Sequence, residues 1–142
     1  MNHRTDRRVL VVDDSEDDRT FVRTALLSVD PDIQISEACD GVEALDYLRS
    51  DRPFPDLILL DLKMPRKDGM ETLAEIRRDP DLRHVPVIAV FTTATDPEYV
   101  RLAYTTGANA YLGKPSTMAS LREVMDAVVK HWFGVVTLPD GA

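Results

Sequence analysis

The chain has 142 residues and a formal net charge of −8, which suits one domain with a single core. Proteins that bind nucleic acid directly usually carry a basic face, so this charge argues against that class. The one cysteine, Cys39, excludes an intrachain disulfide and a cysteine-rich zinc site. No apolar run approaches the roughly 20 residues of a membrane-spanning helix, and the first run is too short for a signal peptide. We therefore expect a cytoplasmic protein without a membrane partner.

Five short apolar runs are spaced along the chain and predict five strands. Three of them are apolar throughout, which is typical of strands buried on both faces of a parallel sheet. One alternates apolar and polar residues, as a half-buried edge strand does, and the last is very short. In chain order the runs are 9–12, 33–38 (the alternating one), 57–60, 85–91 and 110–112.

Amphipathic stretches between these runs predict five helices, each with apolar residues at helical spacing. Ser15 and Asp68 each precede an acidic residue by three positions, which is the pattern of a capping box at a helix start. The expected helices lie at about 16–28, from 42 to near 50, between 68 and 79, around 100–106, and from 121 to 132 with Gly134 ending the last.

Strands that alternate with helices predict a parallel sheet covered on both faces. No linker, repeat or low-complexity segment divides the sequence. We expect one domain over residues 1–142, with its core at about 8–132 and an apolar tail at 133–142. The apolar residues of the tail either fold back on their own domain or form a symmetric dimer contact, and we favour the dimer. They are Trp132, Phe133, Val135 and Leu138.

Polar residues follow four of the five apolar runs at the point where each strand should end. Parallel strands place these ends at one edge of the sheet, where ligands bind, so the residues are expected to converge. Neighbouring carboxylates repel each other unless a cation neutralises them, and their oxygens suit Mg²⁺. Because a carboxylate can accept a phosphoryl group, we infer that Asp61 is a nucleophile and that Lys114 offsets charge. The residues concerned are Asp13, Asp14, Asp61, Thr92, Thr93 and Lys114.

Each of these residues also has a simpler explanation. The pair Asp13 and Asp14 suits the N-terminus of any helix, where the dipole favours acids. Asp61 is also a suitable turn residue before Pro65, and a lysine such as Lys114 is ordinarily on the surface. It is their joint occurrence, each at the end of its own strand, that favours a functional site.

The motifs VVDD at 11–14, LDLKMPRKDG at 60–69, Thr92, and Lys114 with Pro115 occur in this order. With these motifs the chain resembles the receiver domains of two-component response regulators over residues 9–132. The resemblance implies an α/β flavodoxin-like fold, a (βα)5 doubly wound parallel sheet with strand order 2-1-3-4-5. It also implies a phosphorelay in which a sensor histidine kinase is the partner.

By this resemblance, Asp61 takes the phosphoryl group from a phosphohistidine of the kinase. Asp13 and Asp14 match the metal-binding acids, with Asp14 as the more direct ligand. Asp61 and the backbone carbonyl of Lys63 match the further ligand positions. The implied cofactor is Mg²⁺ or Mn²⁺.

The resemblance also implies a conformational switch. Spacing to Gly107 and Lys114 selects Thr92, rather than Thr93, as the hydroxyl drawn toward the phosphoryl group. Tyr111 matches the aromatic residue that reorients on activation, and the Lys114–Pro115 bond matches one that is cis in the family. The switch would change the surface of the fourth helix, fifth strand and fifth helix, where with the tail we also expect a homodimer.

More narrowly, the segments 55–61, 79–86, 107–111 and 132–139 resemble single-domain regulators that serve phytochrome-type histidine kinases. This implies a stand-alone switch rather than an enzyme, one that catalyses only its own phosphotransfer and dephosphorylation. One alternative is a receiver-like interaction module that is never phosphorylated. Another is an aspartyl-phosphate hydrolase, which needs a second acid where Lys63 stands. A mononucleotide-binding protein would need a glycine-rich loop after the first strand.

Overall fold

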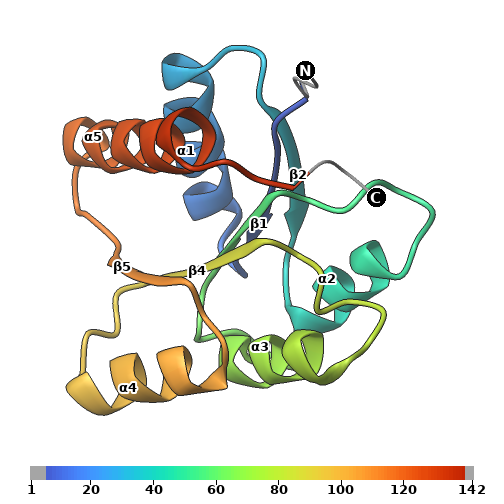
Figure 1. The fold of residues 1–142 in the computed structure, drawn as a ribbon. Coiled ribbons are helices and arrows are strands. Elements are labelled where there is room, and N and C mark those ends of the chain that lie inside the picture. Colours follow the sequence, from blue (N-terminus) through green and yellow to red (C-terminus); the bar gives the residue numbers. More distant parts are fainter. Residues whose placement is uncertain (1–5, 140–142) are drawn as a thin grey trace.

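In a computed structural model, which describes residues 6–139, a five-stranded parallel sheet lies between two layers of helices (Figure 1). The strand order is β2-β1-β3-β4-β5 and every neighbouring pair is parallel, so the predicted order is confirmed. The strands are β1 (Arg8–Val12), β2 (Gln34–Ala38), β3 (Leu57–Leu60), β4 (Val87–Thr92) and β5 (Ala110–Gly113). The helices are α1 (Glu16–Val29), α2 (Gly41–Leu48), α3 (Gly69–Arg78), α4 (Pro97–Thr106) and α5 (Met118–Val129).

The register of the central strands sets the position of the residues that follow them. Val12 at the end of β1 lies opposite Leu60 at the end of β3. The ladder extends one residue beyond both strands, because the N–H of Asp61 donates to the carbonyl of Val12 at 3.0 Å and that of Asp13 donates to Ala38 at 3.0 Å. Asp13 and Asp61 are therefore held side by side at the carboxyl edge of the sheet.

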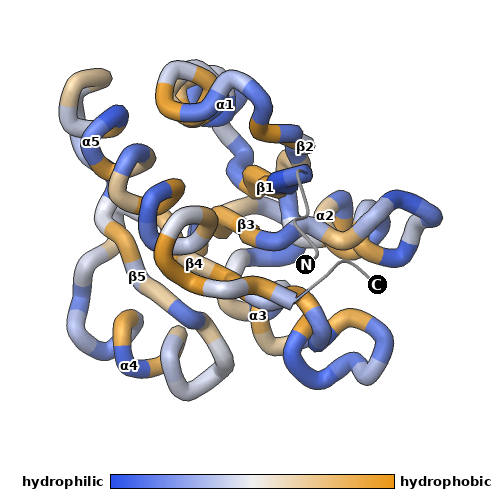
Figure 2. Tube along the Cα trace, turned by 45° about the horizontal axis from the view of Figure 1, so that its top comes forward, coloured by the Kyte–Doolittle hydropathy of each residue, from blue (hydrophilic) through white to orange (hydrophobic). Residues whose placement is uncertain are grey.

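Two hydrophobic cores lie on opposite faces of the sheet. Side chains such as Leu10 and Ile58 pack under α2, α3 and α4, whereas Val9 and Leu59 pack under α1 and α5. Figure 2 shows the hydrophobic colour running along the central strands. Full burial of each such side chain contributes about 1.5–3 kcal/mol to the stability of the folded protein. These cores hold the strands in place, and the polar residues that follow the strand ends lie at the edge of the sheet, outside the cores.

The predicted capping box is complete at the start of α3, but only one of its two hydrogen bonds forms at the start of α1. Asp68 and Glu71 form a complete capping box, in which each side chain accepts the other's backbone N–H. Ser15 caps α1 by accepting the N–H of Asp18 at 3.1 Å. The carboxylate of Asp18 does not complete the box, because it contacts Lys114 instead.

The chain beyond α5 differs from the expectation. Gly134 does not end the helix: a π-helical segment, η1 (Lys130–Val135), continues through it. Trp132, Phe133 and Leu138 pack, partly buried, against the core on the α1 and α5 side, which offsets the roughly 1 kcal/mol cost of a helical glycine. Val135 is 78% exposed. Residues 140–142 of the predicted tail lie outside the described residues.

Within residues 6–139, none of the helices has both the length and the apolar character needed to cross a membrane.

Candidate functional site

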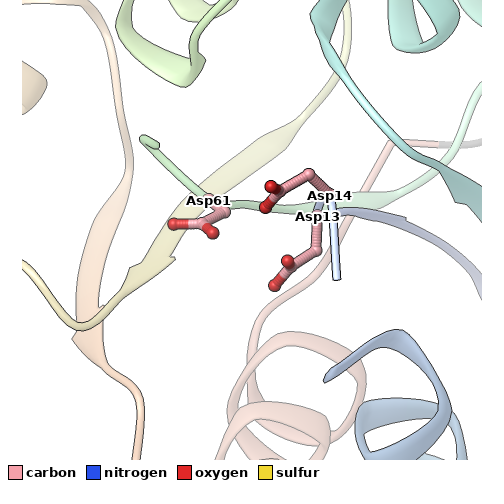
Figure 3. A group of neighbouring side chains, drawn as sticks. All are labelled: Asp13, Asp14 and Asp61. Atoms are coloured by element: carbon pink, nitrogen blue, oxygen red, sulfur yellow. The ribbon is translucent and has the colours of Figure 1, made fainter. Parts of the chain in front are cut away.

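Three carboxylates meet at the carboxyl ends of β1 and β3. Asp13 and Asp61 are buried, with 3% and 7% of their surface exposed, and Asp14 is exposed. One oxygen of each lies within 4.8 Å of the others (Figure 3). The predicted convergence of these three acids is therefore present in the structure.

The turn that carries Asp13 and Asp14 is fixed from two sides. The Oδ1 atom of Asp13 accepts the N–H of Ser15 at 3.0 Å. The guanidinium of Arg19 in α1 donates to the backbone carbonyl of Asp13 at 2.7 Å and pairs with Glu37 at 3.0 Å. The turn is thus tied both to the first turn of α1 and to strand β2.

Lys114 follows β5 and points into the acid group. Its Nζ atom lies 2.6 Å from Asp13 Oδ2, 3.2 Å from Asp61 Oδ2 and 2.9 Å from Asp18 Oδ2. Burial disfavours the charged ammonium, but hydrogen bonds to Asp13 and Asp18 and the charge of Asp61 outweigh it and raise the pKa of Lys114. With Asp14, four carboxylates face one ammonium, which leaves an excess of negative charge.

The pKa of Asp13, the acid beside Lys114, is shifted as well. Burial raises the pKa of Asp13 above its usual value, and the hydrogen bonds from Lys114 and Ser15 only partly offset this. A further cation would counteract that rise, because its positive charge favours the ionised form of the carboxyl. The donor set, made of hard carboxylate oxygens, fits a divalent cation such as Mg²⁺.

The loop between β3 and α3 depends on a glycine at its end. The N–H of Gly69 donates to the carbonyl of Leu62 at 2.9 Å. A Cβ atom at position 69 would lie 2.0 Å from the carbonyl oxygen of Asp61, so a glycine is needed for this close approach. Lys63 lies inside the loop, and its N–H donates to Asp61 Oδ1 at 3.4 Å.

The outer part of this loop is attached to α2. Arg66 has a left-handed backbone, with φ of 63°, which is uncommon for a residue other than glycine. Its Nε atom donates to Asp40 Oδ2 at 2.6 Å, and this contact lowers the pKa of the buried Asp40 carboxyl. No sequence pattern predicts this contact, because its two residues belong to separate segments and both have ordinary local roles.

Thr92 and Tyr111 meet at the loop after β4. Thr92 is 1% exposed, and its hydroxyl oxygen accepts the N–H of Ala94 at 3.3 Å, whereas Thr93 is exposed. The Tyr111 hydroxyl donates to the carbonyl of Ala94. Both side chains therefore contact the same residue of the loop that leads to α4.

The prediction of a cis peptide bond before Pro115 is wrong, because no peptide bond of residues 6–139 is cis. The amide before a proline has only a small preference between its two isomers, so the sequence alone does not decide between them. The N–H of Lys114 donates to the carbonyl of Thr92 at 2.9 Å, which aligns the two strand ends.

The sequence pattern predicts Asp18 only as part of a helix cap. Its carboxylate is instead a third anionic partner of Lys114. A signal was present: Asp18 stands four residues after Asp14, on the first turn of a helix that begins at the carboxyl edge of the sheet.

Comparisons with known proteins agree with this geometry. A family model described as response regulator receiver domain matches residues 9–126. Response regulator Rcp1 of Synechocystis sp. is 36% identical over 136 residues, which cover 92% of each chain. Two solved structures are similar. The phosphorylated cyanobacterial phytochrome response regulator RcpA has a TM-score of 0.89 and 30% identity over 96% of this chain and 100% of RcpA. The Mn²⁺-bound form of Rcp1 has a TM-score of 0.84 and 34% identity over 94% and 99%.

The match with the family model spans the first strand to the last helix, and it includes both acids after β1, Asp61 at the end of β3, and Lys114. The neighbouring structures share the flavodoxin-like arrangement of five parallel strands and five helices, so the predicted fold class is confirmed as well. The chain belongs to the response regulator receiver domain family.

Proposed function

We propose that Asp61 accepts a phosphoryl group from a phosphohistidine of a sensor histidine kinase in a phosphorelay. The observation that carries this proposal is the meeting of Asp13, Asp14, Asp61 and Lys114 within a few ångströms. An oxygen of Asp61 forms the new bond to phosphorus as the P–N bond of the kinase histidine breaks, and the leaving imidazole takes up a proton. Lys114 neutralises part of the added negative charge.

The acids of this site are proposed to hold Mg²⁺ or Mn²⁺. Asp13, Asp14 and Asp61 supply carboxylate oxygens, and the backbone carbonyl of Lys63 is proposed as a further ligand. When bound, the cation spreads the charge of the phosphoryl oxygens. The Mn²⁺-bound structure of Rcp1, a relative of this chain, supports the assignment. Chelation of divalent cations should therefore prevent phosphorylation.

The switch is proposed to act through Thr92 and Tyr111. A phosphoryl group on Asp61 offers acceptor oxygens to the Thr92 hydroxyl, which now contacts Ala94. Movement of the loop at Ala94 changes the hydrogen bond that Tyr111 makes to the same residue. If partner binding to the phosphorylated form were the same in Thr92→Ala as in the wild type, this proposal would be wrong.

The direct test is incubation with acetyl phosphate and Mg²⁺, followed by intact mass measurement. We expect the wild type to gain the mass of one phosphoryl group and Asp61→Asn to gain none. Asp51→Asn, which neutralises an exposed acid elsewhere, is the matched control and should behave as the wild type. A wild type that gains no mass would support the module that is never phosphorylated, and a phosphorylated Asp61→Asn would overturn the assignment.

A phytochrome-type kinase is the proposed phosphodonor, since the relative RcpA is a phytochrome response regulator. We place the kinase contact on α1, next to Lys114. A hollow of about 50 Å³ opens there between Phe21, Pro115 and Leu121, and Phe21 is 51% exposed. Phe21→Ala should slow phosphorylation by the kinase but not by acetyl phosphate. Equal slowing with both donors would argue against a docking role.

Residues 1–142 are proposed to act as one receiver domain, with a core at 8–132, a tail at 133–142 and homodimers formed through α4, β5, α5 and the tail. Exposed apolar residues on these elements support the dimer: Tyr99, Leu102, Tyr104 and Val135. Leu102→Ser combined with Val135→Ser should lower the mass seen by sedimentation velocity. A wild type that is monomeric in both phosphorylation states would remove this proposal.

The proposed switch is not an enzyme with a separate substrate. A hydrolase of the aspartyl-phosphate type needs an acid two residues after the nucleophile, where the exposed Lys63 stands. We therefore expect no turnover of an aryl phosphate, and measurable turnover would favour the hydrolase. The net charge of −8 disfavours binding to nucleic acid or to an anionic membrane. The proposed output is therefore binding to a protein partner in the cytoplasm.

A further inference from the structure

Asp18 lies outside the acid triad, defined here as Asp13, Asp14 and Asp61, yet it shares Lys114 with two members of the triad. Its Oδ2 atom is 2.9 Å from Lys114 Nζ, and its side chain is 42% exposed. Lys114 itself is only 12% exposed. Asp18 therefore stands at the outer rim of the site, on the solvent side of the ammonium.

The position of Asp18 is set by well-defined local contacts. Its N–H donates to the Ser15 hydroxyl at 3.1 Å, and Ser15 donates its own N–H to Asp13 Oδ1 at 3.0 Å. The neighbouring Arg19 holds the carbonyl of Asp13 at 2.7 Å. The first turn of α1 thus fixes the backbone of Asp18 relative to the triad, and the Asp18 carboxylate reaches Lys114 from there.

Lys114 and a divalent cation would compete for the same carboxylate oxygens. The ammonium lies 2.6 Å from Asp13 Oδ2 and 3.2 Å from Asp61 Oδ2. A cation at the triad would be repelled by the ammonium, because like charges at such distances disfavour each other. Asp18 offers the ammonium an anionic partner that does not belong to the triad.

We propose that Asp18 is a positioning residue that holds the Lys114 ammonium at the rim of the site when a divalent cation occupies the acid triad. This inference rests on the proposed function of the triad as a cation site. Without the Asp18 charge, Lys114 has only triad carboxylates as partners, so a cation displaces it less readily. Asp18 thereby favours cation binding and keeps Lys114 close enough to reach a phosphoryl group on Asp61.

The test is a double-mutant cycle that follows Mg²⁺ binding by isothermal titration calorimetry, which needs no phosphorylation. The proteins are the wild type, Asp18→Asn, Lys114→Gln and the double variant, each checked for folding by circular dichroism. Lys114→Ala closes a second cycle in case Lys114→Gln does not fold. Asp17→Asn is the matched control, because it removes a charge from the same helical turn at an exposed side chain.

We expect Asp18→Asn to weaken Mg²⁺ binding about threefold when Lys114 is present, as for a partly exposed ion pair. The effect should shrink to that of Asp17→Asn when Lys114 is replaced. Equal effects of Asp18→Asn with and without Lys114, or an effect no larger than that of Asp17→Asn, would overturn the inference. An Asp61 that cannot be phosphorylated, in a chain where the cycle shows coupling, would overturn only the proposed function.

Discussion

Asp61→Asn is expected to stabilise the metal-free protein, because the acid triad is crowded. Asp61 is repelled by Asp13 and Asp14 across at most 4.8 Å and attracted by Lys114 across 3.2 Å. At an effective dielectric constant of about 20, each repulsion is worth about 3.5 kcal/mol and the attraction about 5 kcal/mol. Exposure screens the repulsion from Asp14 by roughly half, so repulsion and attraction nearly cancel.

The contribution to stability that does not cancel is the cost of burying the charge of Asp61, which is 7% exposed. An asparagine of the same shape has no charge to desolvate, so we expect about 1–2 kcal/mol of added stability. For a domain of this size the melting temperature should rise by about 4 °C.

The assay is thermal and urea unfolding of the wild type and Asp61→Asn, first with a chelator and then with excess Mg²⁺. The cation should stabilise the wild type by mass action and the variant much less. The difference in stability between the two proteins should therefore shrink or change sign. If Asp61→Asn is less stable than the wild type in the chelator, then the attraction between Lys114 and Asp61 outweighs the repulsion within the triad and the cost of burying the Asp61 charge. In that case the excess negative charge is not what favours a cation at this site.

Three further predictions concern the surroundings of the site. Gly69→Ala should cost about 1–3 kcal/mol in urea unfolding, because its Cβ would overlap the backbone of the preceding loop, whereas Gly134→Ala, with nothing within 4 Å, should cost nothing. Burial opposes the charge of Glu37, but hydrogen bonds from two arginines outweigh it and lower its pKa from 4.5. The stability that these two ion pairs contribute is therefore present above the unfolded pKa of Glu37 and lost as pH falls through its lower folded pKa. The roughly 1 kcal/mol advantage of the wild type over Glu37→Gln at pH 7 should accordingly shrink in unfolding measurements as the pH falls below the unfolded pKa, and vanish once Glu37 is protonated in the folded protein as well. Tyr111→Phe removes the hydrogen bond to Ala94, and it should reduce stability by at most about 1 kcal/mol and leave acetyl phosphate labelling intact. A loss of labelling would show that the Tyr111 hydroxyl is needed for the phosphorylation reaction.

The strands were predictable where burial on both faces makes the sequence apolar throughout. Strand β3 has the predicted bounds, since its run ends abruptly at Asp61. Helix α4 was harder, because its apolar residues begin near Val100 while the helix begins at Pro97, whose fixed φ and missing N–H suit a first turn. The tail was harder still, because Gly134 has no neighbour that requires a glycine and the packing of the tail depends on residues far away in sequence.

The convergence of the site followed from topology alone. Parallel strands bring Asp13, Asp61 and Lys114 to one edge whatever the details of their packing. The contact of Asp18 with Lys114 and that of Arg66 with Asp40 could not be derived in this way. Each depends on the rotamers of two side chains from different segments. The place of Asp18 on the first turn of α1 indicates that it lies near the site, but not that it pairs with Lys114.

The way the elements are held indicates which part of the molecule can respond to a charge on Asp61. Asp61 is fixed by its bond to β1 and by the close approach of Gly69, so it cannot move far itself. Helices α1, α2, α3 and α5 each begin with a side-chain cap, whereas Asp96 makes no such bond at the start of α4. A missing cap leaves that helix end about 1 kcal/mol easier to shift. Because the loop at Ala94 joins Thr92 and Tyr111 to this end, we expect the least costly response to phosphorylation to be a movement of α4 and its exposed face.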